Sequence, residues 1–215
     1  MTPEREARIR YAAARRQMDM TVVLENVHDA HNIAAVLRSC ESVGISEIYV
    51  IYTEDHLKKR GLKVGKRTSA GARKWVDVRL YQDLDTCLTR VKKKYQRILA
   101  THLGRQSTSI YQTDFTGGFA LLLGNEADGL SEAAMKYADA NVYIPQMGMV
   151  QSLNISVSCG IILYEVFRQR DAKNMYINNP TQTESMSKEL LNDFIQRHET
   201  GSKGDWAIRE DWIEE

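Results

Sequence analysis

The chain has 215 residues, 43% of them hydrophobic and 27% charged, and a net charge of +1. This length and composition fit one large domain, or one domain with terminal additions. No apolar run approaches membrane-spanning length, and the charged N-terminus is not followed by an apolar segment. We therefore expect a cytoplasmic protein with no membrane partner. The cysteines are dispersed and form no CxxC pair, which excludes a disulfide framework and a zinc ribbon and predicts buried thiols at Cys40, Cys87 and Cys159.

The charges are unevenly distributed along the chain. Eight basic residues and no acidic ones lie between Lys58 and Lys74, and five arginines against two glutamates lie in the first 16 residues. The segment 205–215 is acidic. Such asymmetry favours a polyanionic partner, with RNA or DNA as the leading candidate. The alternative is a set of solvated faces that balance one another in the fold.

The first part of the chain alternates helices with strands. Thr2 and Pro3 predict the start of an arginine-rich helix that ends near Gln17 and lies on the surface of the main domain. A strand, a helix that stops at a glycine, and a second strand follow, and a unit of this kind within about 30 residues implies parallel pairing. These three elements are expected over residues 21–25, 32–43 and 46–52.

The basic segment 53–74 is expected to be a loop, because it contains three glycines and no hydrophobic pattern. The stretch from Gly61 to Arg67 resembles a phosphate-binding loop. It is one residue too short, however, and has no Ser or Thr directly after the lysine, so we reject that interpretation. We expect a mobile loop that contacts phosphates through side chains such as Lys66 and Arg67.

The remaining elements complete an α/β fold with a parallel sheet. The run from Phe119 to Leu123 is continuously hydrophobic, which is typical of a central parallel strand. We expect a core domain over 19–170, between an N-terminal helical arm over 1–18 and a C-terminal helical extension over 171–215. Further strands are expected over 75–81, 97–101 and 141–145, and further helices over 83–94, 131–138, 152–170, 185–197 and 206–213.

Three loops leave the ends of strands with glycines and few bulky side chains: 101–104, 124–126 and 144–151. In an open parallel sheet, ligands bind beyond the carboxyl ends of the strands. Together these loops can offer backbone N–H and C=O groups to a flat ligand such as adenine. The alternative is that the glycines only close turns. No GxGxxG motif follows a strand, so a dinucleotide site of that type is not expected.

Several polar residues stand at or near expected helix starts. Asn32, Ser152 and Asn154 lie in first turns, where they either cap the helix or face a ligand. Glu126 follows a strand end, where it either caps the next helix or projects into a pocket. Arg38 lies within a helix among small residues, and a surface charge is the ordinary interpretation there.

The histidines do not indicate a metal site. His28, His56 and His198 have no ligand-like spacing in the sequence, and His31 has none with an acidic partner. No metal is therefore expected.

Three segments together resemble known motifs. Segment 32–38 (NIAAVLR) has the NxxAxxR pattern of the first motif of the SpoU/TrmH branch of the SPOUT methyltransferases. Segment 123–129 (LGNEADG) resembles the second motif of that family, and segment 144–157 resembles the third. Each motif alone is a moderate signal. All three in the family's order across residues 32–157 make a strong one.

The resemblance implies a fold and a cofactor. The fold would be the α/β parallel-sheet SPOUT fold with a deep C-terminal trefoil knot, formed where 144–170 threads back on itself, as an exception to the rule against knots. The knot would bind S-adenosylmethionine (SAM) in a bent form, and no metal would be needed. The cofactor-binding contacts would come largely from backbone near Thr101, Gly124, Ile144 and Leu153.

The resemblance also implies a homodimer that acts on tRNA rather than DNA. Arg38 would reach the methyl donor bound by the partner subunit, and His31 is a weaker candidate for a role in activity or tRNA binding. By motif position, the catalytic residues would be Asn32, Arg38, Glu126, Ser152 and Asn154. The RNA-binding residues would be Arg8, Lys66, Arg67, Arg168 and Arg170.

The implied reaction is SAM-dependent 2′-O-methylation of a guanosine ribose in the tRNA D-loop, at position 18. The terminal arms favour this substrate, since a ribosomal member would usually carry an added N-terminal RNA-binding domain and a wobble-nucleotide member would end near Arg170. Methylation of rRNA or of the tRNA wobble nucleotide is the alternative. A non-catalytic RNA-binding protein is a third possibility, against which the intact motif residues argue.

Two roles for Arg38 stay open. The ribose 2′-hydroxyl must lose a proton as it attacks the sulfonium methyl, and the arginine of the first motif has been proposed as the base. An arginine is always protonated in proteins, so a literal base would need a large depression of its pKa. The competing hypothesis keeps the guanidinium charged, so that it stabilises the developing alkoxide while a phosphate or a water takes the proton.

Overall fold

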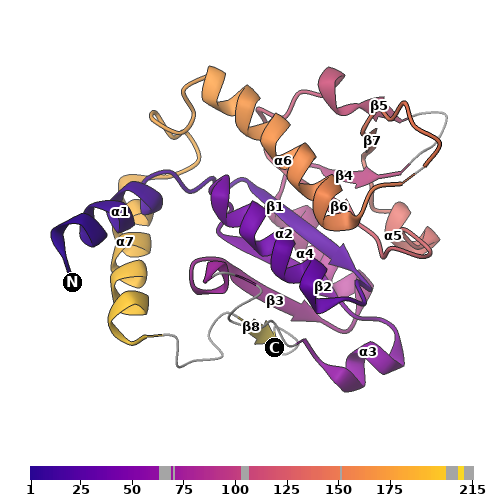
Figure 1. Cartoon of the computed structure of the whole chain (residues 1–215), viewed down its shortest axis with the longest axis horizontal. Coiled ribbons are helices and arrows are strands. Elements are labelled where there is room, and N and C mark those ends of the chain that lie inside the picture. Colours follow the sequence, from indigo (N-terminus) through magenta and orange to yellow (C-terminus); the bar gives the residue numbers. More distant parts are fainter. Residues whose placement is uncertain (63–68, 70, 103–106, 151, 202–207, 211–215) are drawn as a thin grey trace.

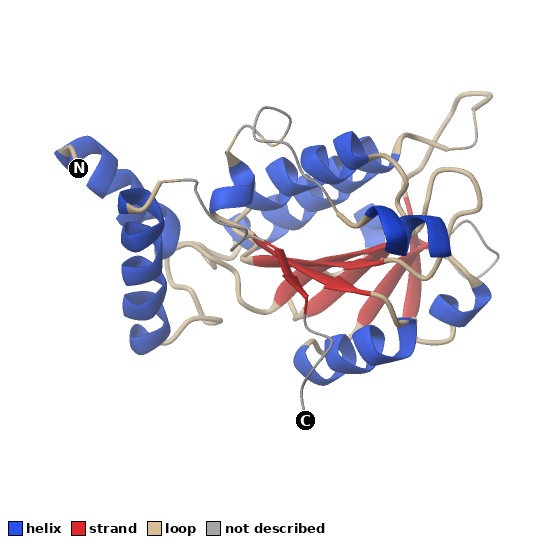
Figure 2. Cartoon of the chain, turned by 90° about the horizontal axis from the view of Figure 1, so that it is seen from below, coloured by secondary structure: helices blue, strands red, loops and turns tan. Residues whose placement is uncertain are grey.

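The chain forms one parallel β-sheet with helices on both faces (Figure 1, Figure 2). The computed structural model describes residues 1–62, 69, 71–102, 107–150, 152–201 and 208–210. The strands are β1 (Met20–Glu25), β2 (Glu47–Ile51), β3 (Asp77–Tyr81), β4 (Ile98–Thr101), β5 (Thr108–Ser109), β6 (Phe119–Leu123), β7 (Ala140–Tyr143) and β8 (Ile208–Glu210). Their order in the sheet is β5-β7-β4-β6-β1-β2-β3-β8, and these neighbours pair in parallel.

Helices cover both faces of this sheet (Figure 2). The helices are α1 (Pro3–Ala13), α2 (Ala30–Ser42), α3 (Asp55–Arg60), α4 (Leu84–Lys94), α5 (Glu132–Met135), α6 (Ile155–Ala172) and α7 (Glu184–Glu199), with short 3-10 turns at η1 (Ala72–Lys74) and η2 (Ile110–Gln112). Of these, α1 and α7 lie at one end of the molecule (Figure 2). None of the helices in the described part of the chain has the length and apolar character needed to cross a membrane.

Alternate residues of the central strands β1, β2 and β6 enter two separate cores. Val22 and Leu24 of β1 pack with α2 and α6, whereas Val23 packs with α4 and α5 on the opposite face. All of β1 is buried, as expected for a strand covered on both faces. The expected buried thiols are confirmed at Cys40, Cys87 and Cys159.

The strand order changes direction between β1 and β6, which are neighbours in the sheet. From β1 the chain proceeds through β2 to β3 on one side, while β4, β6 and β7 lie on the other. Leu24 pairs with Leu123, so the segments that follow β1 and β6 emerge at the same level of the sheet. Such a switch point, beyond the carboxyl ends of the strands, is where open α/β sheets bind ligands.

Two helices begin at residues other than those expected. Asp29 caps α2, and its carboxylate accepts a hydrogen bond from the N–H two residues on, at 2.8 Å. Asn154, rather than Ser152, caps α6 in the same way, also at 2.8 Å. A short side chain that accepts from a first-turn N–H defines the start of a helix. Asn32 therefore lies inside α2 and Ser152 lies before α6, so capping explains neither residue.

Three other segments differ from the expectation. Helix α1 ends at Ala13 rather than near Gln17. The basic segment expected as a loop begins with helix α3, and its residues 63–68 lie outside the described part of the chain. The tail, expected to be helical over 206–213, forms β8 where it is described and pairs with β3. Short strands depend on their pairing partner more than on local sequence, which explains the last difference.

Helices α1 and α7 lie side by side at one end of the molecule (Figure 1). Ile9 and Ala13 of α1 share a small core with Phe194 of α7, so α1 rests on the other arm. Arg16, just after α1, is buried and donates to the Ile45 carbonyl oxygen at 2.9 Å. Burial lowers the pKa of its guanidinium. This arginine therefore stabilises the fold and does not contribute to the expected basic surface.

Arg170 joins the end of α6 to the sheet. Its side chain is 0% exposed. Its Nη1 donates to Gln17 Oε1 at 2.9 Å and to Asp19 Oδ1 at 2.6 Å. Its Nη2 donates to Asp19 Oδ2 at 3.1 Å and to the Gly117 carbonyl oxygen at 2.8 Å, and its Nε donates to the Phe115 carbonyl oxygen at 3.0 Å. Every N–H of the guanidinium is used, so the prediction that Arg170 faces RNA is wrong for this structure.

We expect Arg170→Ala to lower the free energy of unfolding by about 3–5 kcal/mol, because it leaves a carboxylate and two carbonyl groups without their donor. Arg168→Ala is the matched control, since the Arg168 side chain is 67% exposed on the same helix. We expect it to cost far less. Urea denaturation of both variants measures the difference. Equal losses in the free energy of unfolding would show that the buried hydrogen bonds of Arg170 stabilise the fold no more than the exposed ion pair of Arg168 does.

Candidate active site

A cleft of about 720 Å³ opens at the carboxyl edge of the sheet, between the segments that follow β4, β6 and β7 and the start of α6. This volume is within the range of small-molecule sites, roughly 300–1,000 Å³. The three glycine-containing loops meet there as expected, although residues 103–106 and 151 lie outside the described chain. All four residues expected to bind the cofactor line the cleft: Thr101, Gly124, Ile144 and Leu153.

Gly124 allows the segment after β6 to fold back on itself. A Cβ atom at this position would lie 2.1 Å from the carbonyl carbon and oxygen of Gly129, far inside van der Waals contact. The returning loop is closed by two backbone hydrogen bonds between Asn125 and Gly129, at 3.1 and 3.2 Å. The closed loop holds Glu126 at the edge of the cleft.

Three of the expected catalytic side chains are hydrogen-bonded to one another. Asn32 Nδ2 donates to the Glu126 carboxylate, and Asn154 Nδ2 donates to Asn32 Oδ1 at 3.1 Å. Asn154 Oδ1 accepts in turn from the N–H and the hydroxyl of Ser156, at 2.8 and 2.6 Å. This network links the segments after β1 and β6 to the start of α6. It places a carboxylate and two amides beside the cleft, where they can bind and orient a hydroxyl group.

Ser152 also lines the cleft, in the exposed stretch before α6. The structure therefore gathers four of the five expected catalytic residues around one site. Arg38 is the exception.

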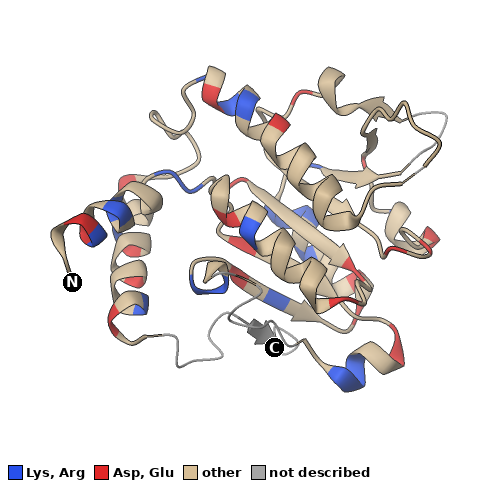
Figure 3. Ribbon diagram, in the orientation of Figure 1, with Lys and Arg blue, Asp and Glu red and all other residues tan. Residues whose placement is uncertain are grey.

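Arg38 lies on the exposed side of α2 and lines a separate pocket of about 310 Å³. Arg5 and Arg8 of α1 share that pocket with Trp75. The Arg5 guanidinium lies 5.3 Å from the centroid of the Trp75 ring, within the distance of a cation–π contact. Figure 3 shows the basic residues that α1, α2 and the turn at 72–74 contribute to this side of the molecule.

The other expected RNA-binding residues occupy different environments. Arg8 is exposed on α1. Arg168 is exposed on α6 and pairs with the buried carboxylate of Glu165 at 2.7 Å, an interaction that raises the pKa of the guanidinium. Lys66 and Arg67 lie outside the described residues.

His31, the weaker candidate, is largely exposed at the start of α2. Its Nδ1 lies 3.0 Å from Asp29 Oδ1, and that contact contributes to lowering the pKa of the Asp29 carboxyl, after the hydrogen bond from the His31 backbone N–H. The ring does not line the cleft.

Two residues that shape the site were not expected from the sequence. Asn125 Oδ1 accepts from the N–H groups of Ala127 and Asp128, at 2.8 and 2.7 Å, and so folds the loop that carries Glu126. Glu25, buried at the end of β1, accepts from the N–H and hydroxyl of Ser131 at 2.9 and 2.6 Å. The role of Asn125 could have been predicted, because an asparagine followed within a few residues by a glycine is typical of turns. The role of Glu25 could not, because its partner lies far along the chain.

Comparison with known proteins places the chain in a family. The profile of the SpoU rRNA methylase family matches residues 19–164. The chain belongs to this SpoU family. It is similar to the tRNA (guanosine(18)-2′-O)-methyltransferase of Escherichia coli, with 35% identity over 89% of this chain and 82% of that protein. It is also similar to the enzyme of the same description from Thermus thermophilus, with 36% identity over 91% of this chain and 98% of that protein.

Solved structures of SpoU proteins share the fold. The A. aeolicus TrmH/SpoU tRNA modifying enzyme superposes with a TM-score of 0.80 and 33% identity, covering 93% of this chain and 98% of that one. The SpoU methyltransferase AviRb from Streptomyces viridochromogenes, in complex with the cofactor AdoMet (S-adenosylmethionine), gives a TM-score of 0.65 and 25% identity, covering 73% of this chain and 62% of that one.

We expect Gly124→Ala to displace the loop 125–129, because the added Cβ meets backbone that cannot yield locally. The cost should be roughly 1–3 kcal/mol in the free energy of unfolding, with faster hydrogen exchange at the Asn125 and Gly129 amides. Gly148→Ala is the matched control, since a Cβ there meets nothing within 4 Å. If both variants behave alike in denaturation and exchange, close packing at Gly124 does not hold the loop.

Proposed function

We propose that this SpoU family member transfers a methyl group from SAM to the ribose 2′-hydroxyl of guanosine 18 in tRNA. The observation that carries the proposal is the network of Asn32, Glu126 and Asn154 at a cleft of cofactor size. It occurs in a chain that is 35–36% identical, over about nine tenths of its length, to tRNA (guanosine(18)-2′-O)-methyltransferases.

The cleft suits SAM in size and in chemical character. Residues 123–130, 142–144 and 146 line it, and the backbone groups of these segments could pair with the edge of an adenine ring. Apolar side chains such as Val142, Ile155 and Ile162 can cover the faces of that ring. Because Gly124 has no Cβ, the loop 125–129 can pack close to β6. This packing leaves space for a ligand in the cleft. When bound, SAM supplies an electrophilic methyl group on a sulfonium centre.

The polar network would position the nucleophile. The Glu126 carboxylate and the amides of Asn32 and Asn154 would accept or donate hydrogen bonds to the ribose hydroxyls, and Ser152 adds a hydroxyl at the same site. Because each amide is already fixed by a neighbour, little reorganisation is needed when ribose binds. We assign Arg38 the role of a charged group that stabilises the developing alkoxide, since an arginine stays protonated in proteins.

Arg38 would serve the cleft of a second copy of the chain. Within one chain, Arg38 and the cleft belong to separate pockets. Beside the cleft, α6 and the stretch before it expose Leu153, Val157 and Tyr164 by 37%, 48% and 56%. Val157 and Tyr164, seven residues apart, lie on one face of α6, and Leu153 lies just before its start. An exposed apolar stripe of this kind suits a symmetric interface, so we propose a homodimer formed through α6.

The trefoil knot and the division of the chain are part of the same proposal. Similarity to SpoU structures supports a knot formed by 144–170 around the cofactor. We propose a methyltransferase domain over 19–170 and arms over 1–18 and 171–215 that together bind tRNA, which the packing of α1 on α7 supports. The exposed Arg8 and Arg168, with Lys66 and Arg67, would contact the phosphates. A tRNA substrate implies that the reaction takes place in the cytoplasm.

Methyl transfer from labelled SAM to unmodified tRNA transcripts tests the proposal. We expect label at the ribose of guanosine 18, and none in a matched transcript that carries 2′-deoxyguanosine at that position. Label in rRNA or at the wobble nucleotide would redirect the substrate assignment. No transfer to any RNA would overturn the enzymatic role.

Subunit mixing tests the placement of Arg38. We expect Arg38→Ala and Glu126→Ala to lower single-turnover methylation by roughly 10²–10³-fold each as homodimers. Arg38→Ala should affect SAM affinity far less than methyl transfer, because the proposed role of the guanidinium is to stabilise an alkoxide that develops only during the reaction. In a mixed dimer one of the two sites keeps both residues, so a 1:1 mixture that exchanges subunits freely should recover roughly a quarter of the wild-type activity. A mixture no more active than its two components would argue against sharing of the site between chains.

A further inference from the structure

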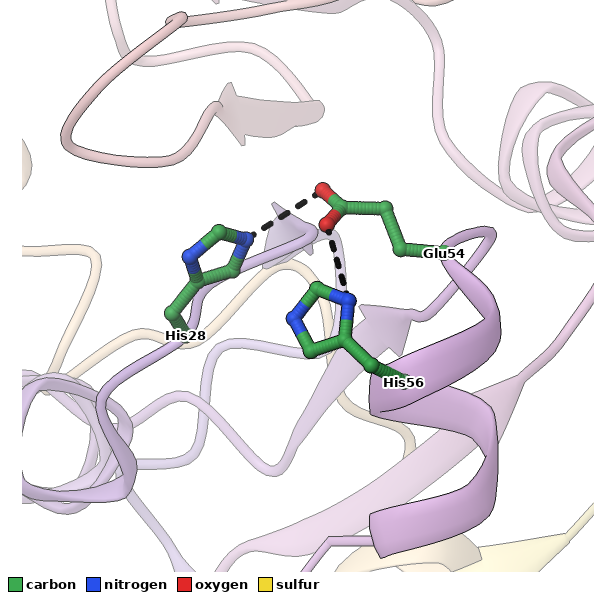
Figure 4. A group of neighbouring side chains, drawn as sticks. All are labelled: His28, Glu54 and His56. Atoms are coloured by element: carbon green, nitrogen blue, oxygen red, sulfur yellow. Dashed lines mark hydrogen bonds and ion pairs between the residues drawn. The ribbon is translucent and has the colours of Figure 1, made fainter.

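His28, in the segment after β1, meets Glu54 and His56, which lie close together in the segment after β2 (Figure 4). Nε2 of His28 lies 3.2 Å from Glu54 Oε1, and Nδ1 of His56 lies 3.4 Å from Glu54 Oε2. The two imidazole rings stand edge to face with centroids 5.3 Å apart. One possible ligand atom from each residue lies within 4.8 Å of the others, and this is the only such group found among the described residues.

The backbone on both sides of this cluster is held in place. Asn26 Nδ2 donates to Thr53 Oγ1 at 2.7 Å, and the Thr53 N–H donates to Asn26 Oδ1 at 2.8 Å. The Arg60 guanidinium donates to the His28 carbonyl oxygen at 2.6 Å, which ties the far end of α3 to the loop after β1. The three side chains therefore start from fixed positions, and an ion that binds them needs little reorganisation of the main chain.

We infer that His28, Glu54 and His56 form a binding site for a divalent transition-metal ion, with zinc as the best fit. Two imidazole nitrogens and a carboxylate oxygen are ligands that zinc prefers. In a tetrahedral site with bonds of about 2.1 Å, neighbouring ligand atoms stand roughly 3.4 Å apart. Here each imidazole nitrogen contacts a different oxygen of Glu54, Oε1 at 3.2 Å and Oε2 at 3.4 Å, so zinc binding requires side-chain rotations that bring one oxygen beside both nitrogens. The fourth position is left for water.

The orientation of Glu54 supports this assignment over helix capping. Glu54 occupies the residue before α3, yet its side chain makes no capping hydrogen bond. Its carboxylate is directed at the two imidazoles instead (Figure 4). The side chains of His28, Glu54 and His56 are 42%, 33% and 63% exposed, so an ion can reach them from solvent.

The site is distinct from the proposed methyltransferase chemistry. None of its three residues lines the cleft. A bound ion would tie the loop that leads into α2 to the start of α3, and α2 carries both Asn32 and Arg38. The same contact would fix α3, whose last turn holds Lys58, Lys59 and Arg60. The ion would therefore act as a structural link, and its presence does not depend on the proposed function.

Zinc titration of the full chain, produced without a histidine tag and stripped with a chelator, tests the inference. We expect saturable binding at a single high-affinity site by calorimetry, a rise in melting temperature with zinc, and ligand-field absorption bands when Co²⁺ replaces zinc. X-ray absorption of the zinc-loaded protein should show imidazole nitrogens and a carboxylate oxygen around the metal.

Variants identify the ligands. His28→Ala, His56→Ala and Glu54→Gln should each weaken zinc binding at least ~10-fold. His31→Ala is the matched control, because this exposed imidazole also contacts a carboxylate, that of Asp29 at 3.0 Å, but has no third ligand within the part of the chain that the structure describes. It should bind zinc like the wild type. Circular dichroism of each metal-free variant controls for folding. If folded His28→Ala and His56→Ala bind zinc as tightly as the wild type, or if the wild type binds none, the cluster is only a carboxylate bridging two imidazoles.

Discussion

The geometry of the site depends on how α6 is fixed, and Arg170 fixes it. Near one end of this helix, the buried guanidinium bonds to the segment before β1 and to the segment before β6. At the other end, Asn154 caps the helix and enters the network with Asn32 and Glu126. The same strands, β1 and β6, carry the loops of these two partners. Helix α6 therefore spans the distance from the buried Arg170 side chain to the cleft. Because Arg170 fixes one end of the helix, it also helps to fix the position of Asn154 at the other end.

The second constraint is the parallel sheet. Because all paired strands run the same way, every loop that follows a strand opens on one edge, and residues far apart in the chain meet there. That single rule produces two groups of side chains. The loops after β1 and β6 bring Asn32 to Glu126, and the loops after β1 and β2 bring His28 to Glu54. The segment that follows β1 therefore carries both a proposed metal ligand, His28, and a proposed catalytic residue, Asn32, four residues apart.

The sequence predicted the parallel sheet, most elements and the cleft residues, because hydrophobic periodicity and strand-end glycines are local signals. It did not predict which charges are buried. Arg170 was assigned to RNA binding, and Arg16 was counted among the basic residues near the N-terminus, but both guanidinium groups are buried and hydrogen-bonded inside the fold. Glu47 shows the same principle: burial favours a raised pKa, but Lys94 and Arg79 lower it to about 2. Such partners lie tens of residues away, so no spacing rule reveals them. The proposed metal ligands gave no spacing signal for the same reason, since His28 meets Glu54 and His56 only after β1 and β2 pair.

The separation of Arg38 from the cleft has a consequence of its own under the proposed function. A single chain would hold the methyl donor beside Asn32, Glu126 and Asn154 but would lack the cation that stabilises the alkoxide. The full site would exist only when two chains associate, so activity would follow the dimer population and fall with dilution. The arginine-lined pocket beside Trp75 would then face the partner's cleft, with the arms of the same chain next to it. One subunit would thus supply the tRNA contacts and the positive charge of Arg38, and the other would supply the methyl donor. Methyl transfer would then require that tRNA docks correctly across both chains.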